Sequence, residues 1–189
     1  MKKKHKGLKI LGIVLGCGLL IGYVIRVFTL NQKYPQPQVQ TFSMNEWANY
    51  DGIEIKATQA QIKDQDFMME NQIMTTAPAP GKEGKLLLVT MELKNGSAET
   101  ARGRVYLTEA ESGAWNNGVA AELISNVNEP GTSLSAPMKS GESKTVVVPF
   151  LINHVQMTDT SWAHAESRSY DLVLGLYPTK KIIPLQITY

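Results

Sequence analysis

The sequence has very little cysteine: Cys17 is the only one among its 189 residues. Without a second thiol, the chain can form no internal disulfide and no cysteine-based metal site. Stability must therefore come from a hydrophobic core, and a domain of about 150 residues buries roughly 70% of the surface that its unfolded chain exposes. The composition is ordinary for such a domain, because 43% of the residues are hydrophobic and 19% are charged.

Acidic residues are absent from the first 26 positions, which hold six of the basic ones. These six are Lys2, Lys3, Lys4, Lys6, Lys9 and Arg26. Without them, the formal charge of +2 for the whole chain becomes −4 for the remainder. A mildly acidic domain lacks the basic surface that attracts nucleic acid, so we expect no nucleic-acid partner.

Recognisable catalytic and metal-binding motifs are also missing. The sequence contains no Gly-x-Ser-x-Gly elbow and no His-x-x-x-His pair. A metal site would have to combine His154 and His164 with an acid such as Asp159 or Glu166, and we expect both histidines to lie on the surface or in turns. The sequence therefore predicts no enzyme, no cofactor and no metal site. An enzyme or metal-dependent domain assembled from scattered residues remains an alternative.

The N-terminal region has the organisation of a membrane anchor. Residues 1–9 form a basic tail, and residues 10–30 are almost continuously apolar, which is long enough to cross a bilayer. Lysines before the span predict a cytoplasmic N-terminus and an extracellular C-terminal domain, with the lipid bilayer as the partner of this helix. A cleaved signal peptide is disfavoured because no small-residue cleavage site follows the span. A lipoprotein lipidated at Cys17 is a further alternative, because residues 14–17 resemble a lipobox.

Residues 31–41 are rich in Gln and Pro and predict an extended linker, so that the folded domain occupies residues 42–189. Within it, residues 85–94 alternate between two faces. One face is apolar throughout, while the other begins with Leu86 and Leu88 and then becomes polar. That period of two is typical of a strand with one side on a core.

Similar strands recur along the domain. Turn signals separate six to eight short strands, and no long segment has a helical period, which predicts an all-β antiparallel sandwich. Residues 144–152 form one of these strands. Pro149 cannot donate to a strand ladder, so this strand should lie at a sheet edge or carry a bulge.

Three segments of the domain resemble those of a known group of proteins: residues 84–95, the Lys-Ser-Gly-Glu turn at 139–142 and the valine-rich strand after that turn. They resemble the immunoglobulin-like extracellular domains of Gram-positive membrane-anchored proteins and lipoproteins. The resemblance covers residues 42–189, with Ser140 where proline is usual. It implies an immunoglobulin-like sandwich in the cell envelope and brings no catalytic residues. Many such proteins have no known function.

The sequence favours a non-catalytic binding or accessory module of a cell-envelope complex, whose partner would be a protein, peptide or wall component. A purely structural spacer is the simpler alternative. Residues 112–118 (SGAWNNG) predict an exposed turn. We therefore expect Trp115, Asn116 and Asn117 to contribute to partner binding, because an exposed indole between flexible polar residues is a good anchor. A Trp115 folded back over the end of the sandwich is an equally strong alternative.

Overall fold

The computed structural model describes residues 2–188, and the chain divides into two compact units between Pro37 and Gln38. The first unit contains one helix, α1 (Lys2–Lys33). Its segment Leu11–Lys33 is long and apolar enough to cross a membrane, and a signal sequence would have the same properties. Cys17 lies inside this helix, in an apolar run that continues well beyond it.

The predicted linker at 31–41 is too long. Helix α1 continues to Lys33, and strand β1 (Gln38–Thr41) already pairs with β9 (Thr179–Leu185). Only residues 34–37 lie between these elements. The sequence places Gln38–Thr41 in the linker because this stretch offers little to bury. The four side chains are exposed in the structure, but a strand at a sheet edge needs only backbone hydrogen bonds.

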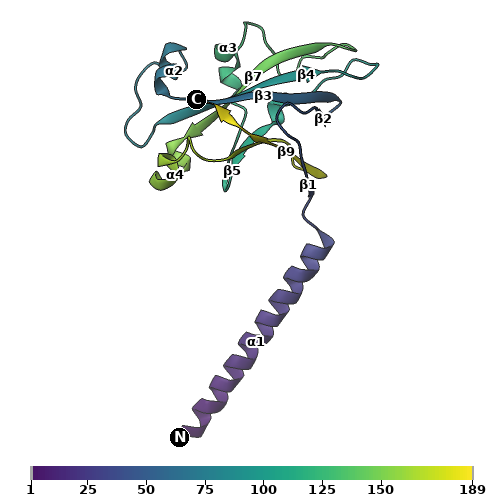
Figure 1. Ribbon diagram of the computed structural model, residues 1–189. Helices are drawn as coiled ribbons and strands as arrows, with labels where there is room; N and C mark the ends of the chain where they lie inside the picture. The colour runs from purple at the N-terminus through teal and green to yellow at the C-terminus, as the bar shows by residue number, and fades with distance from the viewer. Residues whose placement is uncertain (1, 189) are drawn as a thin grey trace. The chain divides into compact units, whose positions relative to one another are not determined.

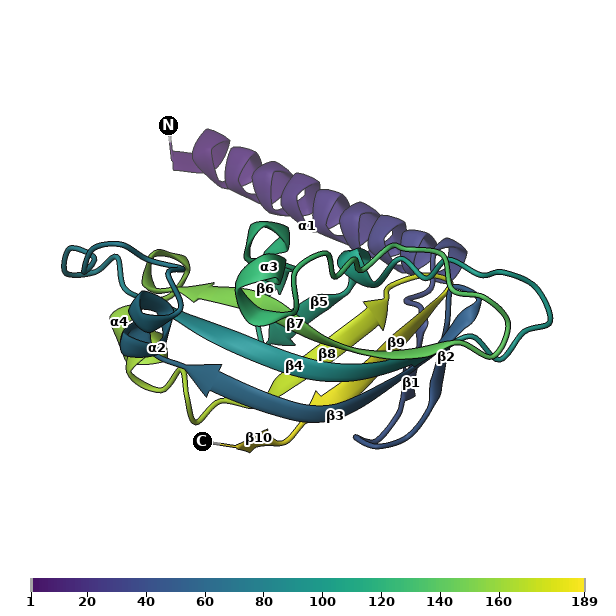
Figure 2. The same cartoon turned by 90° about the horizontal axis from the view of Figure 1, so that it is seen from above.

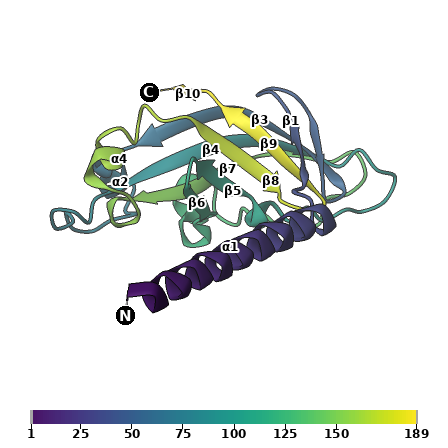
Figure 3. The same ribbon diagram turned by 90° about the horizontal axis from the view of Figure 1, so that it is seen from below.

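The second unit is a sandwich of two five-stranded sheets. The first, here the β8 sheet, has the order β1–β9–β8–β5–β6, where β8 is Tyr170–Gly175, β5 is Glu109–Ser112 and β6 is Trp115–Gly118. The second, here the β4 sheet, has the order β10–β3–β4–β7, and β2 also pairs with β3. Its strands are β10 (Ile187–Thr188), β3 (Ile53–Lys63), β4 (Gly84–Lys94), β7 (Ser143–Asn153) and β2 (Ala48–Tyr50). Figures 2 and 3 show from opposite sides how β8 and β9 cross β3 and β4 obliquely.

The all-β sandwich predicted from the sequence is confirmed, but the sandwich is not purely antiparallel. Strand β1 runs parallel to β9, and β10 runs parallel to β3. Both parallel partners are short strands at sheet edges, where alternating hydrophobicity in the sequence gives no signal of strand direction. All other pairs are antiparallel.

The core lies between the two sheets and contains the side chains that the period-two pattern assigned to it. From β4 it takes Leu87, Val89, Met91 and Leu93, each at most 1% exposed. Strand β7 contributes Val146, Val148, Phe150 and Ile152, and β8 and β9 contribute Leu172, Leu174, Ile183 and Leu185. All residues of the hydrophobic clusters lie between Phe42 and Ile187, so the second unit has a complete core of its own.

Strand β7 is an edge strand, as Pro149 predicted. It pairs with β4 in continuous register from Gly84↔Asn153 to Lys94↔Ser143. Because β7 has no strand on its other side, the missing N–H of Pro149 removes no ladder hydrogen bond.

Short helices cover part of the outer face of the β4 sheet (Figure 1). They are α2 (Gln65–Glu70), η2 (Ala121–Leu123) and α3 (Ile124–Val127). Asp64 caps α2 by accepting a hydrogen bond from Phe67 N at 3.0 Å. Met68 of α2 packs on Leu86 and Leu88 in a second, smaller core. The other short helices are η1 (Val105–Leu107), η3 (His154–Gln156) and α4 (Asp159–Ala163).

Candidate functional site

A groove of about 660 Å³ lies on the outer face of the β4 sheet, beside the small core. Its floor is made by side chains of three adjacent strands. These are Gln59 and Gln61 of β3, Leu88 and Thr90 of β4, and Thr145 and Val147 of β7. Its volume is within the range of about 300–1,000 Å³ that is typical of small-ligand sites.

A β-bulge in β3 places the two glutamines on this face. The pairing with β4 shifts register between Ala57 and Gln59, so that Thr58 is the extra residue. Ala57 and Ala60 are therefore both buried, and Gln59 and Gln61 point outward. A bulge also bends its strand and increases the local twist.

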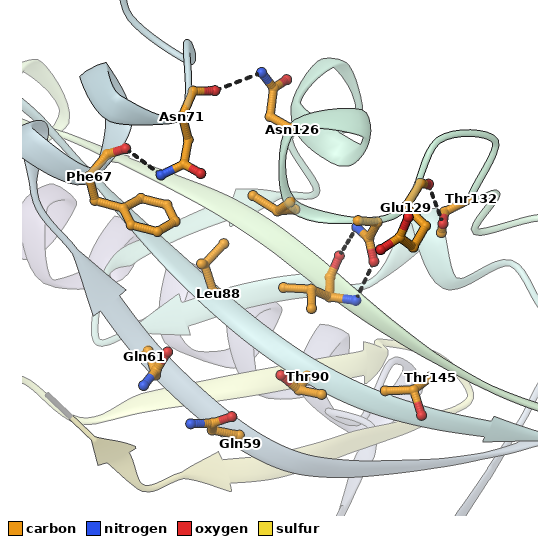
Figure 4. Close-up of a pocket in the computed structure, with 13 residues that line it drawn as sticks. Gln59, Gln61, Phe67, Asn71, Leu88, Thr90, Asn126, Glu129, Thr132 and Thr145 are labelled. Carbon is orange, nitrogen blue, oxygen red and sulfur yellow. Dashed lines mark hydrogen bonds between the residues drawn. The ribbon is translucent and has the colours of Figure 1, made fainter.

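Two segments that are distant in the sequence form the walls of the groove (Figure 4). One wall is α2 and the residue after it, with Phe67 and Asn71, and the other follows α3, with Asn128 and Glu129. Asn126 joins the walls, because its Nδ2 donates to the Asn71 carbonyl at 3.2 Å. The groove thus has a rigid floor of strands and walls made by connecting segments.

The lining of the groove is polar but almost uncharged. Glu129 is its one ionisable residue, and the remaining polar lining residues are carboxamides and hydroxyls. Among residues 11–188, the side chains of Gln59, Gln61, Thr90 and Thr145 make no hydrogen bond to another residue. These four groups can each donate and accept, so they are available to a ligand.

The sequence contained one signal of this site. Leu86 and Leu88 face away from the main core, on a strand face that becomes polar at Thr90. Two buried leucines on an outer face require a cover, and α2 with the segment around α3 provides it. The groove begins where that cover ends.

Trp115 does not form an exposed anchor. The turn of the β5–β6 hairpin is confined to Gly113 and Ala114, so Trp115 is already in β6, opposite Ser112. Its side chain is 7% exposed, its ring meets Tyr170 edge-to-face at 5.8 Å, and its Nε1 donates to Gln156 Oε1 at 3.1 Å. The turn signal in SGAWNNG was correct, but it did not extend to the tryptophan.

The two asparagines after Trp115 have different environments. Asn116 is exposed, whereas Asn117 is half-buried and donates from Nδ2 to the Leu151 carbonyl at 2.7 Å. Asn117 therefore connects β6 to the edge of β7. A role of Trp115, Asn116 and Asn117 in partner binding stays a prediction, and the buried indole removes the reason for which it was made.

The imidazole of His154 has two acidic partners and an aromatic one. Its Nδ1 lies 2.7 Å from Glu83 Oε2, its Nε2 lies 3.0 Å from Asp159 Oδ1, and its ring stacks on Trp162 at 4.9 Å. The hydrogen bond that His154 donates to the Glu83 carboxylate raises the pKa of His154 above 6.5, with a smaller contribution from Asp159. The same hydrogen bond lowers the pKa of Glu83 to about 2.

This cluster joins two segments of the chain. His154 N also donates to the Glu83 carbonyl at 2.9 Å, which ties the end of β7 to the residue before β4. His164, the second candidate metal ligand, is exposed at the C-terminal end of α4. Within residues 2–188, no group of three or more His, Cys, Asp or Glu side chains is arranged to hold a metal ion.

Comparison with known families decides the classification of the chain. Residues 39–181 match the family model described as Domain of unknown function (DUF5028). The chain belongs to this family. None of the curated proteins matches the sequence. The matched range includes every strand from β2 to β8 and every residue that lines the groove.

Several solved structures are similar to the DUF5028 domain. An uncharacterised β-sandwich protein of Clostridium difficile is 12% identical, with 80% of this chain and 97% of that chain covered and a TM-score of 0.46. A secreted protein of Mycobacterium tuberculosis, MPT63, is also 12% identical, with 77% and 97% covered and a TM-score of 0.44. A putative lipoprotein of Bacillus subtilis is 8% identical, with 77% and 39% covered and a TM-score of 0.46.

Proposed function

We propose that this protein is a non-catalytic binding module with an immunoglobulin-like sandwich, held at the outer surface of the membrane by α1, and that its ligand binds in the groove over β3, β4 and β7. The observation that carries the proposal is the set of hydrogen-bonding side chains on the groove floor that have no partner among the described residues.

The strand order supports an immunoglobulin-like sandwich. Strands β3, β4 and β7 correspond to strands A, B and E of that fold, and β6, β5, β8 and β9 correspond to C′, C, F and G. Tyr170, at the start of β8, donates from its hydroxyl to the Ala165 carbonyl at 2.7 Å. A tyrosine at the start of strand F that hydrogen-bonds a few residues upstream is the tyrosine corner of immunoglobulin-like domains.

The length and apolar character of Leu11–Lys33 support a membrane anchor. The lysines that precede this segment support a cytoplasmic N-terminus and an external domain. Protease added to intact cells should then degrade the domain and leave the helix protected. Complete protection of the domain would contradict this orientation, and release of a domain without α1 into the medium would instead indicate a cleaved signal peptide.

A binding function, as opposed to catalysis, is supported by the lining of the groove. Hydrolysis by general acid and base commonly uses a pair of positioned ionisable groups, and Glu129 is the one ionisable residue that lines the groove. The unpaired carboxamides and hydroxyls on the floor are suited to orienting a polar ligand.

The proposal can be tested with residues 38–189, because this unit has its own complete core. Thr90 lies in the middle of the groove floor, so Thr90→Tyr should fill the groove. Gln40→Tyr on the exposed strand β1 is the matched control. Binding would be measured by calorimetry against uncharged oligosaccharides, uncharged peptides and an anionic polymer. We expect the wild type and Q40Y to bind at least one class and T90Y to bind none. Equal binding by T90Y would contradict the groove as the site.

A further inference from the structure

We infer that the ligand of the groove is an uncharged oligosaccharide. This inference rests on the proposed function and specifies its ligand. It follows from three features of the groove: the charge of its lining, the hydrogen-bonding groups on its floor, and the state of the sheet edges beside it.

The first feature is the near absence of charge. The lining contains one carboxylate, that of Glu129, and no lysine, arginine or histidine. Phosphate and carboxylate ligands are usually bound through arginine or lysine side chains. A polyanion would therefore meet a carboxylate in the groove without a compensating cation, and a neutral ligand fits better.

The second feature is the type of hydrogen-bonding group on the floor. Gln59 and Gln61 of β3 and Thr90 and Thr145 of β4 and β7 lie on neighbouring strands of one surface (Figure 4). Gln59 is directly paired with Thr90 in the ladder, and Gln61 with Leu88. A carboxamide and a hydroxyl each donate and accept, as a sugar hydroxyl does, so a row of these groups matches a polyhydroxylic chain without buried charge.

The apolar part of the lining extends this match. Phe67 stands at the α2 end of the groove, and Leu88 lies on the floor near it. The Phe67 ring is half-buried, and Lys63 Nζ lies 5.7 Å from its centroid. Binding sites for small polar ligands combine such apolar surfaces with a few placed polar groups, and the C–H faces of a pyranose ring supply the apolar complement.

The third feature argues against the usual binding mode of an extended peptide, because much of each sheet edge beside the groove is already occupied. A peptide strand adds to a sheet through the backbone groups of an open edge. On β7, Asn128 binds both backbone groups of Val147 at 2.7 Å, Ala120 N donates to the Pro149 carbonyl at 2.9 Å, and Asn117 binds the Leu151 carbonyl. On the opposite side, β2 and β10 pair with β3. An oligosaccharide needs only the side chains of the floor, which remain accessible.

The test uses residues 38–189 and four probes: the tetramer of β-1,4-linked N-acetylglucosamine, the tetramer of β-1,4-linked glucose, an uncharged Gly-Ser-Asn peptide, and polyphosphate. Calorimetry would compare the wild type with Gln59→Ala/Gln61→Ala and with the control Gln40→Ala. We expect a tetramer to bind and Q59A/Q61A to weaken its binding about tenfold or more, since two side chains that can hydrogen-bond to the sugar are lost. Q40A should bind as the wild type does.

A variant that still folds is needed for this comparison, and the glutamines are suitable because their side chains lie outside the core. Circular dichroism and the melting temperature would verify the fold. Binding of the peptide or polyphosphate without either tetramer, abolished by T90Y, would overturn the oligosaccharide and keep the groove as the site. Tetramer binding that T90Y and Q59A/Q61A leave unchanged would overturn both proposals, as would the absence of binding by every probe.

Discussion

Asn128 pairs with Val147 as a neighbouring strand would. Its Nδ2 donates to the Val147 carbonyl at 2.7 Å, and its Oδ1 accepts from Val147 N at 2.7 Å. The same Nδ2 also donates to the Ile124 carbonyl at 3.0 Å. One side chain therefore closes the middle of the β7 edge, where an open strand would offer a template for pairing with another chain.

Replacing Asn128 by alanine should both destabilise the domain and promote self-association. The backbone N–H and carbonyl of Val147 would lose their partner, which costs about 1–3 kcal/mol of unfolding free energy. Urea denaturation would measure the loss, and size-exclusion chromatography would detect dimers formed through β7. Asn116→Ala is the control, because Asn116 is exposed and should change stability by no more than about 0.5 kcal/mol. A monomeric N128A of wild-type stability would contradict this role.

Tyr170→Phe tests the hydrogen bond from the tyrosine corner to Ala165. The ring would keep its packing, but the buried Ala165 carbonyl would be left without its 2.7 Å donor. We expect a loss of about 1–2 kcal/mol in unfolding free energy, measured by urea denaturation. Tyr177→Phe should be neutral by comparison, because Tyr177 is 85% exposed. If both substitutions changed the unfolding free energy equally, the hydrogen bond from Tyr170 to Ala165 would not be a source of stability.

Trp115→Ala should behave as a core substitution. Its ring is buried against Tyr170, so truncation removes a large apolar contact and leaves the Gln156 hydrogen bond unmade. We expect a loss of about 3–5 kcal/mol in unfolding free energy. Trp47→Ala should cost less, because Trp47 is 36% exposed. If W115A melted like the wild type but lost its ligand, the exposed-anchor hypothesis made from the sequence would be restored.

The His154–Glu83 pair should make stability depend on pH in a defined window. The pKa of His154 is raised above 6.5, so its stabilising contribution is complete below about pH 6.5 and disappears as the pH rises through the raised value. The pKa of Glu83 falls from 4.5 to about 2, so its contribution is complete above about pH 4.5 and is lost toward pH 2.

The melting temperature of the wild type minus that of His154→Gln should therefore be largest between about pH 4.5 and 6.5. Differential scanning calorimetry across pH 2–9 would measure it. His164→Gln, at an exposed position, is the matched control and should produce no such window. A difference between wild type and H154Q that grows steadily above pH 8 would show that the pair does not stabilise through a charged imidazole.

Much of the sandwich could be predicted because several of its strands alternate between apolar and polar side chains. The set Leu87, Val89, Met91 and Leu93 has a period of two and is buried as that period requires. In β3 the alternation of Ile53, Ile55 and Ala57 with polar residues extends only as far as Thr58, whereas the strand continues to Lys63. The bulge at Thr58 reverses the alternation, and a single-period pattern cannot continue through such a reversal.

The groove could not be predicted in the same way, because it depends on contacts between segments far apart in the chain. Phe67 and Asn71 line the same groove as Asn126 and Asn128 only because the sheet brings both connections to one face. At Trp115 the sequence predicted an exposed turn where the structure has a strand. Its neighbours are turn formers, and only the pairing of Ser112 with Trp115 shows that the hairpin has already returned to the sheet.

Both walls of the groove are made by connections between strands, and such connections can change in length without changing the sheet. One wall belongs to the connection between β3 and β4, and the other to the connection between β6 and β7. Insertions and deletions in either connection would widen, narrow or reshape the groove while β3, β4 and β7 kept their register. Relatives with the same sandwich can therefore present grooves of different shape by changes in loop length alone, without a new core.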